Sequence, residues 1–126
     1  MKPIARPVYL DLLRIHLPLA GWVSILHRVS GVLLFVAVPL GVWALSVSLA
    51  SEDGFRRVAD WAADPLAKLF LLLGVWAFTH HFFAGLRHLA LDINWGLSLE
   101  RARQSSLAVM LAAGLVTLLA AWRLFA

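Results

Sequence analysis

The stretch VSGVLLFVAVPLGVWALSVSLA, residues 29–50, contains 22 residues and no charged side chain. An α-helix rises about 1.5 Å per residue, so roughly 20 apolar residues cross the ~30 Å hydrocarbon core of a bilayer. The run therefore predicts a membrane-spanning helix. Pro39 interrupts it and should kink the helix mildly, because proline removes a backbone hydrogen bond.

Two later runs show the same pattern. Residues 69–86 are uncharged apart from His80 and His81, and residues 104–122 carry no charge. Each should be helical, because hydrocarbon offers no partner for free backbone N–H and C=O groups. We therefore expect an all-α membrane protein with one membrane-anchor domain, residues 1–126, divided into an N-terminal arm at 1–21 and spans at about 22–50, 65–91 and 104–124.

The composition supports this class. Hydrophobic residues make up 62 % of the chain and charged residues 14 %, whereas a soluble domain is nearer half apolar and a quarter charged. The chain has no cysteine, which excludes a disulfide frame and a cysteine-ligated iron–sulfur cluster or zinc site within it. The net charge of +4 does not indicate a nucleic-acid partner, because the basic residues lie at the ends of the apolar runs.

The basic residues also predict the direction of insertion. Short polar connections at 51–64 and 92–103 join the three spans. The first residues lack the apolar core and cleavage site of a signal peptide, so we expect the N-terminal arm to be retained. Lysines and arginines number seven on one side and four on the other, which predicts a cytoplasmic N-terminus; the two sets are Lys2, Arg6, Arg14, Arg28, Arg87, Arg101 and Arg103, against Arg56, Arg57, Lys68 and Arg123.

The second span ends in a histidine-rich stretch, THHFFAGLRHLALD, residues 79–92. Titratable groups inside a membrane helix are costly and usually face a protein interior or a cofactor. His81, Gly85, His88 and Asp92 are spaced four, three and four apart, so on a helix they form one stripe. His80 points about 100° away from His81, since successive helical residues turn by that angle, and only one of the two can lead the stripe.

This stripe has the chemistry that a b-type heme requires. A neutral imidazole is a good iron ligand, and Gly85 would let a large planar ring approach. Arg87 and His88 would lie near the membrane interface and could pair with the heme carboxylates. The third span has no histidine and the first has only His27, near its inner end. A second axial ligand would therefore come from another protein.

A structural interpretation is also available for these histidines. An intramembrane histidine can simply hydrogen-bond a neighbouring helix. We favour that interpretation for His80, and for His81 both remain open on spacing alone.

The stretch SILHRVSG, residues 24–31, forms a second polar group at the inner end of the first span. Ser24 and Arg28 are four residues apart and share a helix face, with His27 beside them. An arginine next to a hydroxyl suits a quinone carbonyl, because it donates hydrogen bonds and favours the negative charge that a quinone gains on reduction. The alternative is an arginine that reaches lipid phosphate.

RPVYLDL (6–12), SILHRVSG (24–31) and HHFFAGLRHLALD (80–92), in this order and spacing, resemble the family of cytochrome b membrane-anchor subunits of succinate dehydrogenase, respiratory complex II. The resemblance implies that His81 is an axial ligand of heme b, and its register with Gly85 favours it over His80. It also implies that Ser24 and Arg28 line a ubiquinone pocket, and that the residues near the heme propionates are His27, Arg28 and His88.

The same resemblance implies the partners and the place of the protein. We expect a second membrane-anchor subunit that supplies the other heme ligand and completes a helical bundle, together with an iron–sulfur subunit, a flavoprotein subunit and the lipid bilayer. The expected location is the bacterial inner (cytoplasmic) membrane. This chain would not oxidise succinate itself, since it lacks cysteines and a dinucleotide-binding glycine pattern. The alternatives are the anchor of a fumarate reductase and a non-redox scaffold membrane protein.

Overall fold

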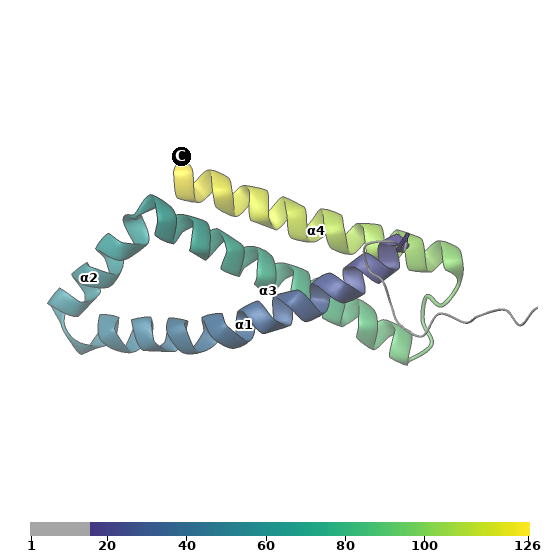
Figure 1. Ribbon diagram of the computed structural model, residues 1–126, viewed down its shortest axis with the longest axis horizontal. Helices are drawn as coiled ribbons and strands as arrows, with labels where there is room; N and C mark the ends of the chain where they lie inside the picture. Colours follow the sequence, from purple (N-terminus) through teal and green to yellow (C-terminus); the bar gives the residue numbers. More distant parts are fainter. Residues whose placement is uncertain (1–15) are drawn as a thin grey trace, which may run out of the picture.

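The computed structural model describes residues 16–126, which form four α-helices. The helices are α1 (Leu19–Ala50), α2 (Glu52–Ala63), α3 (Pro65–Asp92) and α4 (Leu99–Phe125), as Figure 1 shows. α1, α3 and α4 are each long and apolar enough to cross a membrane. The prediction of an all-α protein with three long apolar helices is therefore confirmed. The motif at 6–12 and the basic residues Lys2, Arg6 and Arg14 lie outside the described residues.

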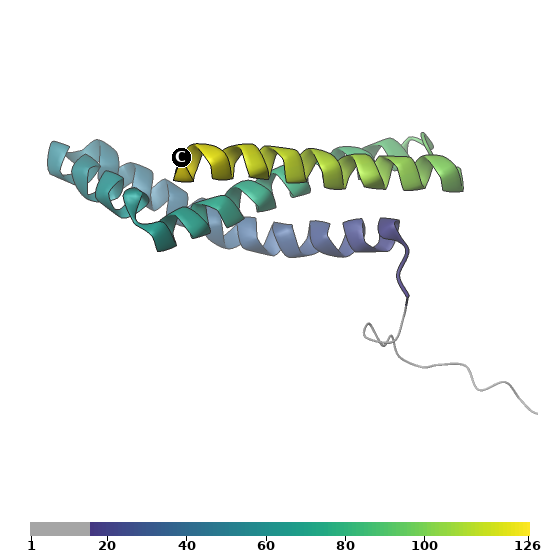
Figure 2. The same ribbon diagram turned by 90° about the horizontal axis from the view of Figure 1, so that it is seen from above.

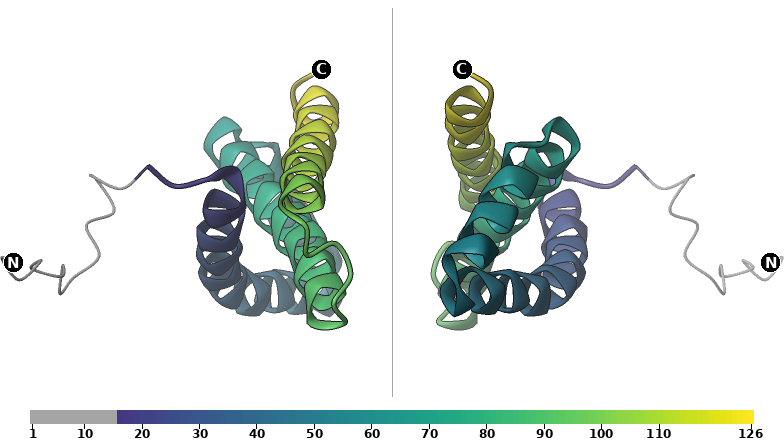
Figure 3. Two further views of the ribbon diagram at one scale, coloured as in Figure 1. Left: turned by 90° about the vertical axis from the view of Figure 1, so that its right-hand side faces the viewer. Right: turned by 90° about the vertical axis from the view of Figure 1, so that its left-hand side faces the viewer.

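Seen end-on, α3 lies between α1 and α4 (Figure 3), and the view from above shows α3 running obliquely to both (Figure 2). The start of α1, the end of α3 and the start of α4 lie at one end of the molecule, and α2 lies at the other (Figure 1). α1 stays one continuous helix through Pro39 and bends partway along its length (Figure 1). α1 and α3 cross near the first end and diverge towards α2.

The buried apolar side chains of residues 16–126 are all alanine or valine. Val23, Ala84 and Val109 form the core, and the half-buried Phe83 and Met110 pack against it. Most large apolar side chains point outward, and Phe35, for example, is 81 % exposed. The most apolar 18-residue stretch of α1 contains no residue that is buried within the chain. These surfaces require lipid or other protein around them, because leaving so much apolar area in water would be unfavourable.

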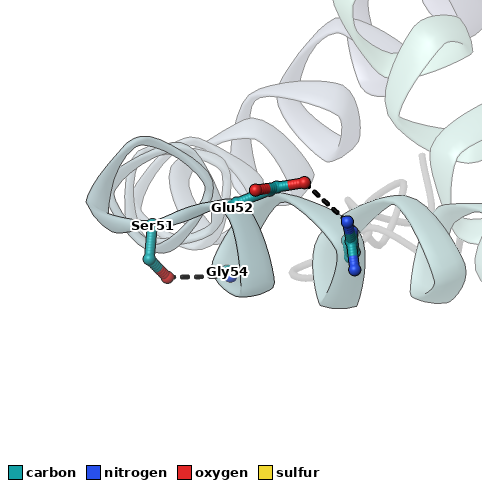
Figure 4. A network of polar contacts seen from close by, with 4 residues as sticks. Ser51, Glu52 and Gly54 are labelled. Atoms are coloured by element: carbon teal, nitrogen blue, oxygen red, sulfur yellow. Dashed lines mark hydrogen bonds and ion pairs between the residues drawn. The ribbon is translucent and has the colours of Figure 1, made fainter.

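The connection at 51–64 differs from the polar linker expected, because most of it is the helix α2. Ser51 caps this helix by accepting a hydrogen bond from the Gly54 backbone N–H at 3.0 Å. Glu52 and Asp53 lie in the first turn, where they interact favourably with the helix dipole. Arg56 forms an ion pair with Glu52 one turn away, and Figure 4 shows the capping bond and the ion pair.

Side chains also cap α3 and α4, whereas α1 begins after Pro18 without a side-chain cap. Asp64 accepts hydrogen bonds from the backbone N–H groups of Leu66 and Ala67 at the start of α3. Ser98 accepts one from the Arg101 N–H at 3.4 Å, so α4 begins before the apolar run at 104–122 does. Capping satisfies backbone donors that the first helical turn leaves without a partner.

Gly54 allows α2 to fold back against the end of α1. A Cβ atom at this position would overlap the Val47 carbonyl oxygen, whereas a Cβ at Gly74 would meet nothing within 4 Å. We expect Gly54→Ala to destabilise the protein by about 1–3 kcal/mol, the usual cost of overpacking. Thermal unfolding of the purified protein in detergent measures the effect. Gly74→Ala is the matched control and should be neutral or slightly stabilising, because alanine favours helix by about 1 kcal/mol over glycine; equal effects at the two positions would contradict the packing argument.

Candidate functional site

The crossing of α1 and α3 brings three histidines from two helices together. The rings of His27 on α1 and His81 on α3 are stacked, with centroids 4.1 Å apart and planes 12° apart. His88, two turns after His81 on α3, also lies beside His27, with ring centroids 5.1 Å apart. The structure therefore joins the two polar stretches of the sequence into one site.

His81 is oriented by the backbone of α1. Its Nδ1 lies 3.0 Å from the His27 carbonyl oxygen and 3.3 Å from Ser30 Oγ. The Ser30 hydroxyl donates its own hydrogen to the same carbonyl, at 2.9 Å. The carbonyl can only accept, so Nδ1 carries the proton and donates it, which leaves Nε2 as the nitrogen with a free lone pair.

The Nε2 atom of His81 is available to a ligand. It makes no hydrogen bond within residues 16–126, and it is not among the buried side-chain atoms that lack a partner there. It therefore reaches the surface of the chain. An imidazole whose Nδ1–H donates to a backbone carbonyl while Nε2 stays open has the arrangement found in metal-ligating histidines.

His80 differs from His81 in having no accessible ring nitrogen. Its side chain is fully buried and stacks on Trp76 with centroids 5.6 Å apart. Nε2 lies 3.5 Å from the Val23 carbonyl oxygen on α1, a long contact, and Nδ1 is buried with no partner in the described chain. His80 thus packs α3 against α1 within this chain and presents no accessible nitrogen.

Two glycines make room for the histidine rings. A Cβ at Gly31 would lie 3.0 Å from His81 Cε1, so α1 can carry no larger residue there without moving that ring. A Cβ at Gly85 would lie 3.6 Å from His27 Nε2. The surface over Gly85 was expected to be open to a planar ligand, but the His27 ring covers it. The tightest contact to His81 instead comes from Gly31 on the facing helix.

The remaining predicted residues lie around this cluster. Ser24 is half-buried and Arg28 is exposed, and neither side chain forms a hydrogen bond or ion pair within residues 16–126. Most other hydroxyls of the long helices donate to a backbone carbonyl three or four residues earlier, as those of Ser46 and Thr117 do. Asp92 is the exposed last residue of α3.

Two contacts were not foreseen from the sequence. Ser30 is fully buried and helps hold His81; its position next to Gly31 gave a signal, since adjacent small residues let helices approach closely. Arg87 was expected to share the carboxylate-pairing role of His88. It turns instead towards α4, where its Nε donates to Ser105 Oγ at 3.1 Å, because consecutive helical residues point about 100° apart.

The histidine cluster fits a ligand that needs one nitrogen from this chain. Within residues 16–126, no three histidine or acidic side chains lie close enough to hold a metal ion by themselves. His81 can supply one axial nitrogen to a planar iron cofactor, and His27, His88 and Arg28 can donate to carboxylates beside it.

Comparison with known proteins gives a consistent result. Residues 2–121 match the family model described as succinate dehydrogenase/fumarate reductase transmembrane subunit. Succinate dehydrogenase cytochrome b556 subunits are similar: that of Paracoccus denitrificans is 39 % identical, covering 83 % of this chain and 81 % of its own, and that of Coxiella burnetii 35 %, covering 91 % and 93 %. The mitochondrial succinate dehydrogenase cytochrome b560 subunit of Bos taurus is 32 % identical, covering 75 % of this chain and 60 % of its own.

Proposed function

Because the chain belongs to the family of succinate dehydrogenase/fumarate reductase transmembrane subunits, we propose that it holds heme b through His81 and forms part of a ubiquinone-reduction site. Its function is that of the cytochrome b anchor subunit of complex II. It is a multi-pass membrane protein. The names of its relatives imply a b-type heme and the other subunits of the complex.

The heme proposal rests on the single observation that His81 presents Nε2 outward while its Nδ1 is held by the His27 carbonyl. When bound, the heme supplies a one-electron redox centre. The chain's own contribution is to fix the imidazole in one tautomer and one orientation. Ser30 reinforces this by binding the same carbonyl, and Gly31 leaves the space that the ring needs to lie against α1.

The carboxylate-binding role of the cluster follows from its charge and position. His27 and His88 lie beside His81, and Arg28 follows His27 on the exposed side of α1. These side chains can donate hydrogen bonds to the propionates of the heme. All three residues lie near the end of the bundle where α1 starts and α3 ends.

The quinone proposal rests on Ser24 and Arg28. The two residues lie one turn apart on α1, and both have free donors within the described chain. Arg28 would donate to a quinone carbonyl oxygen and stabilise the negative charge that develops there. Ser24 would fix the position of the ring. Most other hydroxyls in the long helices donate a hydrogen bond to the helix backbone. A hydroxyl without such a bond, like that of Ser24, is free to donate to a ligand.

The finer assembly is part of the same proposal. A second anchor subunit would supply the other axial ligand and cover the apolar faces of α1 and α3, while iron–sulfur and flavoprotein subunits would bind at the end where α1 starts. We propose that this end is cytoplasmic, in a bacterial inner membrane. Within residues 16–126 the cations divide four against four, so the excess that favours this direction comes from Lys2, Arg6 and Arg14. The succinate-oxidising direction is supported by the names of the relatives, although the family description covers both directions.

The ligand assignment predicts opposite results for two adjacent histidines. His81→Ala should remove or strongly perturb the heme, because the axial nitrogen is lost. His80→Ala should keep the heme spectrum, because His80 only packs against α1. The reduced-minus-oxidised spectrum of the purified complex measures both. If His80→Ala bleaches the heme and His81→Ala retains it, the ligand is reassigned.

Gly31→Ala provides a milder test of the same contact. A Cβ 3.0 Å from His81 Cε1 should force the ring to shift by a few tenths of an ångström, and so change the heme spectrum and its midpoint potential. Gly41→Ala is the control, because a Cβ there meets nothing within 4 Å. A redox titration of both variants that gives the wild-type curve would show that Gly31 does not govern the ligand.

Arg28→Leu separates the quinone role from the heme role. The complex should keep its heme but lose quinone reductase activity by about 10- to 100-fold, as expected for a charged hydrogen bond that acts on developing charge. Succinate oxidation with an artificial electron acceptor should be unchanged, since that chemistry lies in other subunits. Normal quinone turnover in this variant would exclude Arg28 from the site.

A further inference from the structure

The chain contains a second polar site, away from the histidines. A cavity of about 560 Å³ lies between the end of α3, the connecting loop and the start of α4. Its polar lining residues are Arg87, Arg101, Gln104 and Ser105. None of the histidines lines it, and the proposed heme and quinone functions make no use of it.

Arg87 is the central feature of this cavity. It is only 9 % exposed, and its Nε donates to Ser105 Oγ, which in turn donates to the Ala102 carbonyl. The two terminal nitrogens of the guanidinium have no hydrogen-bond partner within residues 16–126, and they are not enclosed atoms. They therefore reach the cavity with donors to spare. A largely buried cation without a counter-ion is costly, so a ligand that supplies negative charge would be strongly favoured.

No acidic residue among residues 16–126 forms an ion pair with Arg87 or Arg101. The cavity lining contains two arginines and no carboxylate. The one ion pair among residues 16–126 joins Arg56 to Glu52, and it lies on α2 at the opposite end of the molecule (Figure 1). Glu100 binds Gln104 but does not line the cavity. The lining itself therefore carries a net positive charge.

The rest of the cavity is apolar and opens where a bilayer changes from hydrocarbon to headgroups. Leu86, Ala90 and Ala108 continue its wall along α3 and α4, and Leu86 is half exposed on the membrane-facing surface. Trp95 lines the cavity at the ends of both spans, and indole rings prefer this interfacial level. Charge next to an apolar groove at that depth matches a molecule with an anionic head and an acyl chain.

We propose that this cavity binds one anionic phospholipid. Arg87 and Arg101 bind its phosphate, because guanidinium groups donate paired hydrogen bonds to phosphate oxygens. Gln104 donates one amide N–H to Glu100 at 3.4 Å and has a second to contribute to the phosphate. The acyl chain lies along Leu86, Ala90 and Ala108. Ser105 is a positioning residue, since it holds the Arg87 guanidinium at Nε and leaves its outer nitrogens for the lipid. A carboxylate from a soluble partner subunit is the competing occupant.

The test uses the assembled complex, stripped of lipid in a neutral detergent. Native mass spectrometry measures binding of phosphatidylglycerol and, separately, of phosphatidylcholine. We expect one phosphatidylglycerol per copy of this chain, bound about tenfold more tightly than phosphatidylcholine, and about tenfold weaker binding in Arg101→Gln. Arg87→Lys should also weaken binding, because it keeps the charge but loses the fork of donors. Arg123→Gln, which removes an exposed cation at the far end of α4, is the matched control and should bind as the wild type does.

Controls distinguish the lipid from other occupants. The heme spectrum of each variant reports whether the complex is intact, so a poorly folded Arg87→Lys leaves Arg101→Gln as the deciding variant. If sodium phosphate displaces phosphatidylglycerol at equal concentration, the site binds free phosphate and the lipid proposal is wrong. It is also wrong if Arg101→Gln binds phosphatidylglycerol like the wild type, or if the stripped complex binds none because a partner carboxylate fills the cavity.

Discussion

The close approach of α1 to α3 at Gly31 is the contact on which the rest of the site depends. In a bilayer there is no hydrophobic force to pull two apolar helices together, so close packing and interhelical hydrogen bonds have to do so. Gly31 lets the His81 ring come within contact distance of the α1 backbone. That approach puts Nδ1 in reach of the His27 carbonyl and of Ser30. A larger residue at position 31 would separate the helices and free the histidine at the same time.

This contact gives two adjacent histidines different roles. His80 and His81 point about 100° apart on α3. The first turns into the interface of its own chain, where both of its nitrogens are enclosed. The second is held at one nitrogen by α1 and keeps the other open. The same helix–helix interface therefore hides one imidazole and presents the other, and both results follow from where α1 lies relative to α3.

α3 carries polar groups on two of its sides, and each side belongs to a different neighbour. The histidines face α1, whereas Arg87 faces α4 and is held by Ser105. The central place of α3 (Figure 3) makes this division possible. Redox cofactor binding and the proposed lipid binding can thus occupy the same end of the bundle without sharing a side chain. It also explains why Arg87 and His88, neighbours in the chain, do not act together.

The sequence alone determined the three spans and the helical stripe of His81, Gly85 and His88, because the bilayer thickness and the helical repeat are fixed lengths that a residue count can match. It did not reveal α2, whose capping by Ser51 and close approach at Gly54 depend on where α1 ends. The roles of Ser30 and Gly31 and the turn of Arg87 towards Ser105 also required the tertiary structure. Periodicity says which residues share a face of one helix, but only the packing of helices decides which face meets which neighbour.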